Sequence, residues 1–316
     1  MENLSIVTCI SNVMIFVLLA MPGYVTGRLK LLTPAQLDGL SYLMMNFLWP
    51  AMLLDVMSSV RINNTLLHTV IYTGIISFIV YLLSLLIAYI YTRICGAAEP
   101  LAGILMFAIA FNNTGFIGMP FIKAVLGTEA LFIASVIEVI IDILIFTVGI
   151  MLVRPDRKAQ KSLHPKSLLT PAFVSILIGF AILGFRIPLP QIILNPVGYL
   201  SDATTAIAMF LVGAQFGEVS LKELFLARKT YGITFLRMIL IPLLLYLVLF
   251  VFLKANTLSN TVLVLMFGMP TAACTAIMAR QYRNHYILAT HCVIMTTLCS
   301  AVMLPLWLLL TTADIF

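Results

Sequence analysis

The chain has 316 residues, of which 62% are hydrophobic and only 9% are charged, and its mean hydropathy is +1.12. Soluble domains carry about 25% charged residues, so this composition excludes a soluble protein and predicts an all-α integral membrane protein in a lipid bilayer. The formal net charge of +6 is explained by basic loops at a membrane surface, and no nucleic-acid partner is expected.

Ten segments are candidates for membrane-spanning helices, because a helix needs about 20 apolar residues to cross a bilayer. The sixth is shorter than the others, and together they take up most of the chain. In chain order they cover residues 4–22, 37–57, 66–92, 101–125, 130–153, 170–184, 197–216, 231–253, 258–279 and 286–310.

The distribution of Lys and Arg predicts the topology. Thirteen of the 18 basic residues fall in the loops after the first, third, fifth, seventh and ninth segments. Basic loops mark the cytoplasmic side, so both termini are expected outside the cell (inner or plasma) membrane. The basic cytoplasmic linker 154–169 separates a first five-helix repeat, 1–153, from a second, 170–316. Because each repeat has an odd number of spans, the second is expected to be inverted.

The tripeptide Gly-Met-Pro occurs once in each half, at 118–120 and at 268–270, inside the fourth and ninth segments. A proline within a helix removes a backbone hydrogen bond, and polar groups freed in hydrocarbon need protein partners or a water-filled cavity. Matching breaks in two inverted halves are typical of secondary transporters, in which broken helices build the substrate site. We therefore expect helices four and nine to break and to cross.

Small and polar residues surround both predicted breaks, where half-helix N-termini would favour the carboxylate of an anionic substrate. The two adjacent asparagines point in different directions, so at most one is expected to touch the substrate. The alternative is that these side chains bond to neighbouring helices. The candidate substrate-binding residues are Asn112, Asn113, Thr114, Gly115 and Pro120 in the fourth segment, and Pro270, Thr271 and Cys274 in the ninth.

The pattern Asn113-Thr114-x-x-x-Gly118-x-Pro120 resembles the crossover motif of the auxin efflux carrier family, and the resemblance extends over the whole chain. It implies scaffold helices 1, 2, 6 and 7, transport helices 3–5 and 8–10, an elevator-type motion, a homodimer and organic-anion substrates. Asn113, Pro120 and Pro270 are the positions that carry over. The long cytosolic loop of the plant auxin exporters is absent, which favours a prokaryote-type member similar to malate permeases.

Two carboxylates in the fifth segment form a candidate coupling site. Glu138 and Asp142 lie one helical turn apart on one face, and their mutual repulsion favours the binding of a proton by one of them. His291 lies in the tenth segment, the equivalent of the fifth in the second half. The three residues are predicted to couple transport to H+, with Na+ as the second choice; the alternative is a structural carboxylate–histidine pair. No cofactor or metal is expected.

Other features bear on the class of protein. No Walker, GxGxxG, HExxH or GxSxG motif occurs, so the protein is not expected to be an enzyme. Arg237, in the eighth segment, is expected to extend to the cytoplasmic surface or to neutralise a substrate anion. The prediction is a secondary transporter of small organic anions, such as malate, malonate or auxin-like acids. The alternatives are a sodium- or proton-coupled carrier of a larger amphipathic anion, of bile-acid type, and a non-transporting membrane sensor.

Overall fold

The computed structural model describes residues 6–59, 64–154, 171–185, 187–218, 229–255, 257–282 and 284–312. In these ranges the chain is helical apart from short connections, and its β pairing is confined to one isolated bridge between Asn112 and Thr271. The predicted all-α membrane class is confirmed. Most of the predicted linker, residues 155–169, lies outside the described residues.

The helices of the first half begin and end as follows: α1 Ile6–Arg28, α2 Pro34–Leu43, α3 Trp49–Ser59, α4 Asn64–Ile94, α5 Leu101–Ala110, α6 Met119–Leu144 and α7 Ile150–Val153. Those of the second half are α8 Pro171–Phe185, α9 Gln191–Glu218, α11 Lys229–Phe235, α12 Ile241–Tyr246, α13 Leu258–Phe267, α14 Cys274–Gln281 and α15 Tyr286–Thr312. Short π-helical turns join several of these helices, including Met44–Leu48 between α2 and α3 and Thr114–Gly118 before α6.

Six helical stretches of the described chain are long and apolar enough to cross a membrane: Ala35–Ser59, Leu67–Ile94, Thr114–Val153, Gln191–Gly217, Thr230–Phe252 and Tyr286–Thr312. This number is lower than the ten predicted segments partly because the fourth and ninth are interrupted. Their first halves, α5 and α13, have 10 residues each. The predicted boundary between the fourth and fifth segments appears as a kink inside α6 at Gly127, whose φ of 83° is a conformation that favours glycine.

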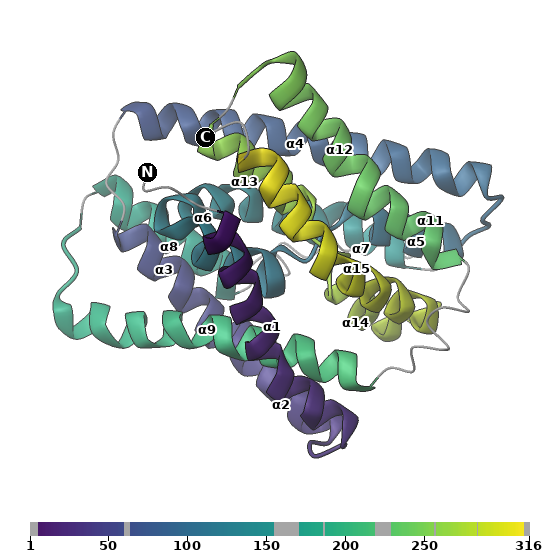
Figure 1. The fold of residues 1–316 in the computed structure, drawn as a ribbon, viewed down its shortest axis with the longest axis horizontal. Coiled ribbons are helices and arrows are strands. Elements are labelled where there is room, and N and C mark those ends of the chain that lie inside the picture. Colours follow the sequence, from purple (N-terminus) through teal and green to yellow (C-terminus); the bar gives the residue numbers. More distant parts are fainter. Residues whose placement is uncertain are drawn as a thin grey trace.

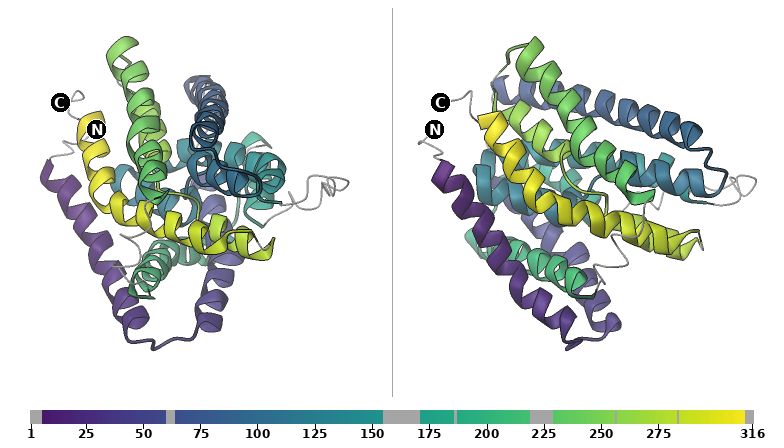
Figure 2. Two further views of the ribbon diagram at one scale, coloured as in Figure 1. Left: turned by 90° about the vertical axis from the view of Figure 1, so that its right-hand side faces the viewer. Right: turned by 45° about the vertical axis from the view of Figure 1, so that its right-hand side comes forward.

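The helices pack in two groups. The α1/α9 group contains α1, α2, α3, α8 and α9: α1 packs along α9, and α3 packs against α8 and α9. The crossover group contains α4 to α7 and α11 to α15, in which α4 packs on α5 and α6, and α13 packs on α6 and α15. Figure 1 shows α4 and α9 at opposite margins of the molecule, and Figure 2 shows the same separation from two other sides.

Glycines allow α1 and α9 to approach closely. A Cβ atom at Gly23 would collide with the backbone of Phe210, and one at Gly213 would collide with the backbone of Ala20. Gly27 and Gly217 face the opposite helix in the same way. Each helix thus carries a Gly-x-x-x-Gly spacing, and the two spacings face each other. This arrangement recurs where membrane helices pack closely. Gly23 meets Phe210, and Gly27, one turn later in α1, meets Ala214, one turn later in α9. The helices α1 and α9 therefore run parallel.

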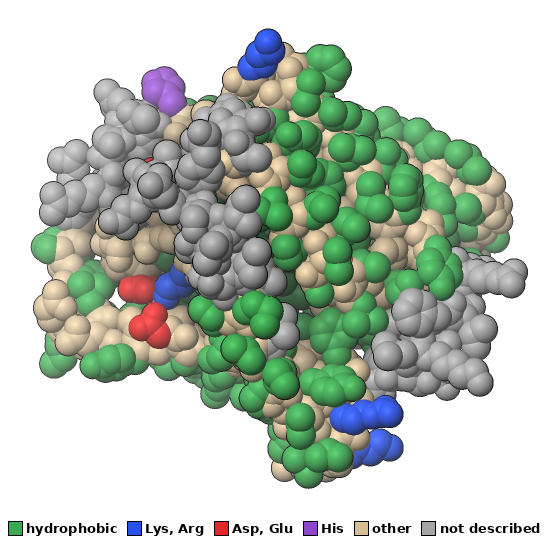
Figure 3. All heavy atoms as spheres, in the orientation of Figure 1, with side chains coloured by type: hydrophobic (Ala, Val, Ile, Leu, Met, Phe, Trp, Pro, Cys, Tyr) green, Lys and Arg blue, Asp and Glu red, His purple; other side chains and the backbone are tan. Residues whose placement is uncertain are grey.

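The surface carries the apolar side chains that a lipid-facing helix requires. Along α4, Leu67, Ile71, Ile75 and Phe78 are each about half exposed or more, between 48% and 55%. Figure 3 shows hydrophobic side chains spread over the visible face of the helices, with few charges among them. A protein surface in water rarely exposes so many apolar side chains together. This pattern agrees with a multi-pass membrane protein.

Candidate functional site at the helix crossover

The two broken segments cross and pair through their backbones. The N–H of Asn113 donates to the carbonyl oxygen of Pro270 at 2.7 Å, and the N–H of Ala272 donates to that of Phe111 at 3.0 Å. These bonds form the isolated antiparallel bridge centred on Asn112 and Thr271. They satisfy backbone groups that two helix breaks would otherwise leave without partners in hydrocarbon.

The position of the first break differs from the sequence-based expectation. The chain is extended at Phe111, where α5 ends, whereas Pro120 lies in the first turn of α6, directly after the π-helical turn. The half-helix already begins at Thr114, so Pro120 lies inside it. The π-helical turn before it, in which Met119 donates to Thr114, replaces regular α-helical hydrogen bonding at this point. Pro270, in contrast, lies within the second break and accepts a hydrogen bond there.

Asn112 and Thr271, the two bridge residues, hold the crossover together. Asn112 accepts a hydrogen bond from the hydroxyl of Tyr81 at 2.8 Å and donates to the carbonyl of Met266 at 2.5 Å. Thr271 donates through its hydroxyl to the carbonyl of Ala108 at 2.8 Å. Both side chains are buried, and their hydrogen bonds are made to partners within the protein.

Asn113 differs from its neighbour in one important respect. Its side-chain oxygen accepts a hydrogen bond from the N–H of Phe116 at 3.3 Å, which caps the N-terminus of the following half-helix. Its side-chain nitrogen forms no hydrogen bond with another residue in the described part of the chain. Asn113 therefore presents an uncommitted amide donor at a helix N-terminus inside the membrane region, an arrangement that favours an anion.

Gly115 has a packing role in this turn. A Cβ atom there would collide with the indole ring of Trp49 in α3. The glycine thus lets a side chain of the α1/α9 group lie directly against the half-helix N-terminus of the crossover group. This close approach is lost with any larger residue at position 115.

Arg237 also contacts the crossover, and the prediction that it extends to the cytoplasmic surface is wrong. It does not extend to the membrane surface, since it is fully buried. Its Nε donates to the carbonyl of Met269 at 3.0 Å, and its Nη1 donates to the carbonyl of Ile109 at 3.2 Å. These carbonyls lie at the C-terminal ends of α13 and α5, where the helix dipole is negative. The guanidinium thus neutralises helix ends through Nε and Nη1. Its Nη2 has no hydrogen-bond partner among the described residues, so contact with a substrate anion stays a prediction.

The two carboxylates of the predicted coupling site lie deep in the crossover group. Glu138 is 1% exposed and Asp142 is 8% exposed. The Glu138 carboxyl lies close to the side chain of Thr114, next to Asn113. Glu138 Oε2 and Asp142 Oδ2 have no hydrogen-bond partner among the described residues, so both carboxyls retain capacity for a proton or a cation.

Cys274 and His291 complete the predicted set. The Cys274 thiol, at the start of α14, is within electrostatic range of both carboxyls. His291, in α15, is joined to neither carboxyl by an ion pair or a hydrogen bond in the described ranges. The geometry thus brings Glu138, Asp142 and Thr114 together, while the coupling role of His291 stays a prediction. The described residues contain no cluster of His, Cys, Asp and Glu that would hold a metal ion.

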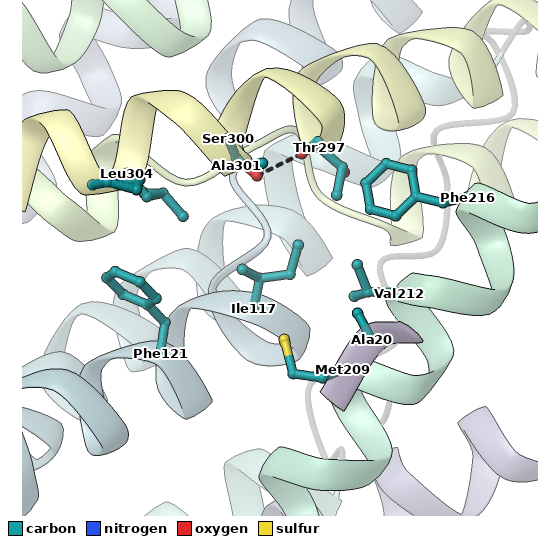
Figure 4. A pocket seen from close by; sticks show the side chains of 11 residues that line it. Ala20, Ile117, Phe121, Met209, Val212, Phe216, Thr297, Ser300, Ala301 and Leu304 are labelled. Carbon is teal, nitrogen blue, oxygen red and sulfur yellow. Dashed lines mark hydrogen bonds between the residues drawn. The ribbon is translucent and has the colours of Figure 1, made fainter. Parts of the chain in front are cut away.

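A cavity of about 120 Å³ borders the crossover. Its walls come from α1 and α9 on one side and from the π-helical turn, α6 and α15 on the other. Figure 4 shows Ile117 and Phe121 facing Met209 across it. Its polar lining side chains, Thr297 and Ser300, donate to carbonyls of their own helix at 2.7 Å. The lining contains no charged residue.

Comparison with known proteins gives the family. The model of a family described as membrane transport protein, the auxin efflux carrier family, matches residues 8–165 and again residues 156–308. The chain belongs to this family. It is also similar to an uncharacterized transporter of Methanothermobacter thermautotrophicus, with 26% identity over 301 residues that cover 94% of this chain and 95% of the relative. Both matches are to transporters and not to enzymes.

In this member of the auxin efflux carrier family, three residues at the crossover escaped the sequence-based site prediction. Tyr81 and Trp49 contact the fourth segment from other helices, and Arg237 was assigned other roles. For Arg237 a signal existed, because a charged residue deep in an apolar segment indicates a functional role or a buried partner. Tyr81 and Trp49 resemble ordinary aromatic residues of membrane helices and offered no comparable signal.

Proposed function

We propose that this protein is a secondary transporter of organic anions that bind at the crossover. The side-chain amide of Asn113 and the N-terminus of the half-helix that begins at Thr114 would hold the carboxylate. The single observation that carries this proposal is the uncommitted amide of Asn113 at the N-terminus of a half-helix. The cavity is lined from the same half-helix by Ile117 and Phe121. Cys274 begins the second half-helix, α14, and would add its N-terminal dipole.

We propose ten membrane crossings in two inverted repeats, with both termini outside the cell membrane. Helix lies in each of the ten predicted segments, and the family model matches once in each half. The parallel course of α1 and α9 agrees with this topology, in which the first and seventh spans run in the same direction. Together these observations support the topology that the basic residues predict.

The α1/α9 group would form the scaffold, and the crossover group would move against it in an elevator-type cycle. The cavity supports this proposal, since its two walls belong to different groups and a relative movement would open it to one side or the other. Exposed apolar residues on α9 offer a surface for a homodimer through the scaffold, with Ile192 at 82% and Tyr199 at 77% exposure.

A second candidate substrate class, a larger amphipathic anion, is favoured by the cavity lining. Apolar walls stabilise the apolar body of a ligand, whereas a dicarboxylate such as malate would need a partner for its second charge. The lining residues supply none. Among organic anions, the cavity therefore favours a monocarboxylate with an apolar body, of auxin or bile-acid type.

We propose that Glu138 and Asp142 couple transport to protons, with Na+ as the alternative ion. The closeness of Glu138 to Thr114 places this pair next to the half-helix that would bind the substrate. A proton taken up by the pair removes one buried negative charge, which offsets the charge of an arriving anion. Sodium dependence of uptake distinguishes the two ions.

Uptake into proteoliposomes tests the proposed function. Purified protein would be supplied with labelled malate, malonate, succinate and indole-3-acetate, with and without a pH gradient, and protein-free liposomes serve as the control. We expect saturable uptake of one anion, with indole-3-acetate ahead of the dicarboxylates. No uptake of any of the four would count against the proposal and favour the sensor alternative.

A further inference from the structure

A cluster of charged side chains connects the two helix groups at one end of the cavity. Lys123, in the first part of α6, donates to Asp202 Oδ1 at 3.1 Å and to Ser201 Oγ at 2.9 Å, both in α9. Its ammonium also lies 4.0 Å from the carboxylate of Asp55 in α3. In the space-filling view, acidic and basic side chains face each other in a hollow above the left part of α9 (Figure 3).

The members of the cluster belong to different groups. Lys123 is part of the crossover group, whereas Asp55, Ser201 and Asp202 are part of the α1/α9 group. The other contacts that the structure gives between α6 and the α1/α9 group are apolar. Phe132 packs on Phe180 of α8, and Phe121 faces α9 across the cavity. Any sliding of one group along the other must therefore break the bonds of Lys123.

The cluster lies directly beyond the cavity. Phe121, two residues before Lys123, lines the cavity from α6. Met209 lines it from α9 and follows Asp202 by two helical turns, or about 10 Å. Each of the two helices thus contributes residues both to the cavity and to the cluster. The predicted topology places Lys123 on the outer side.

We propose that Lys123, Asp55 and Asp202 form an ionic gate that closes the outer end of the cavity between the two helix groups. The gate is intact in this structure and must open when the cavity becomes accessible from outside. This inference rests on the proposed alternating access, but it concerns a separate set of residues and needs no knowledge of the substrate.

The exposure of the cluster makes it suitable for a reversible gate. The side chains of Lys123 and Asp55 are 21% and 29% exposed, and that of Asp202 is 79% exposed. Each ion pair with this much access to water contributes little free energy. A small network of them should therefore change the equilibrium between the closed and the open state only a few-fold. Such a gate biases the transporter toward the closed state without locking it there.

Accessibility of a cavity cysteine to a membrane-impermeant thiol reagent tests the gate. Ser300→Cys places a thiol of nearly the same size in the cavity lining, in a chain whose native cysteines are replaced by alanine: Cys9, Cys95, Cys274, Cys292 and Cys299. The reagent is added outside intact cells. We expect Lys123→Gln and Asp202→Asn to raise the labelling rate by roughly fivefold each.

Lys254→Gln is the matched control, because Lys254 is a second lysine predicted on the outer side, is exposed, and forms no ion pair with the described residues. It should leave the labelling rate unchanged. Lys123→Arg should also keep the slow rate, since it retains the charge. Equal labelling in the Lys123→Gln, Asp202→Asn and unmodified backgrounds would overturn the gate. Labelling needs no substrate, so failure of the gate is distinguishable from failure to transport the tested anions.

Discussion

Replacement of Arg237 by methionine should destabilise the protein strongly, because the guanidinium donates hydrogen bonds to carbonyls at both helix breaks. It removes the hydrogen bonds to Met269 at 3.0 Å and to Ile109 at 3.2 Å, together with a longer contact to Ala110 at 3.5 Å. The carbonyls left behind are buried and lie at the negative ends of two helices. An apolar side chain at position 237 supplies neither a donor nor a positive charge.

The magnitude follows from the two firm hydrogen bonds. A bond to a charged group contributes about 1.5–3 kcal/mol, so two of them contribute about 3–6 kcal/mol. Removal of the buried guanidinium, whose Nη2 has no partner among the described residues, relieves some desolvation and leaves a net loss of about 3–5 kcal/mol. At roughly 2 °C per kcal/mol for a chain of this size, Tm should fall by about 6–10 °C. Arg237→Lys keeps the charge but reaches fewer of the carbonyls, so its Tm should fall by about half as much.

Thermal unfolding of the purified protein in detergent measures this effect. Arg93→Met is the matched control, since Arg93 lies exposed at the end of α4, over the ring of Tyr89, and its replacement should change stability by less than about 1 kcal/mol. A fall of less than about 2 °C for Arg237→Met, equal to that of the control, would refute the idea that this arginine neutralises the helix ends.

Three further changes test other parts of the structure. Asp142→Asn should abolish the response of uptake to an imposed pH gradient, and an unchanged response would exclude this residue from coupling. Gly213→Leu should separate α1 from α9 and lower the yield of folded monodisperse protein, whereas Gly198→Ala, which meets no neighbouring atom, should leave it unchanged; equal yields would contradict the close packing. Thr271→Val removes the hydrogen bond to Ala108 and should lower Tm by about 2 °C, close to 1 kcal/mol; no fall would show that the bond contributes nothing.

The sequence was sufficient to locate the crossover but not its geometry. The repeated Gly-Met-Pro indicated both breaks, because proline and glycine disturb a helix wherever they occur. The extended residues nevertheless precede Pro120, which lies inside the following half-helix, directly after its π-helical turn. Which residue of an Asn-Asn pair is free depends on partners elsewhere in the chain, here Tyr81 and Met266, and a linear pattern does not encode them.

Arg237 shows a second limit of prediction from sequence. Its acceptors are backbone carbonyls, available only because α5 and α13 end inside the membrane region. No residue type marks such acceptors, so the sequence favoured the more general expectations of a surface contact or a substrate contact. The Gly-x-x-x-Gly spacings were visible in the sequence, but their mutual contact required the relative placement of α1 and α9.

Uptake by an Asn113→Ser variant tests the central claim, that an organic anion binds at the crossover through Asn113. Serine retains an oxygen that caps the helix N-terminus but lacks the amide donor, so Tm should stay within about 2 °C of the wild type. Loss of a hydrogen bond to a charged ligand costs about 1.5–3 kcal/mol, so the apparent affinity for the transported anion should fall by roughly 10-fold to 100-fold. Unchanged affinity and rate in the folded variant would contradict the account.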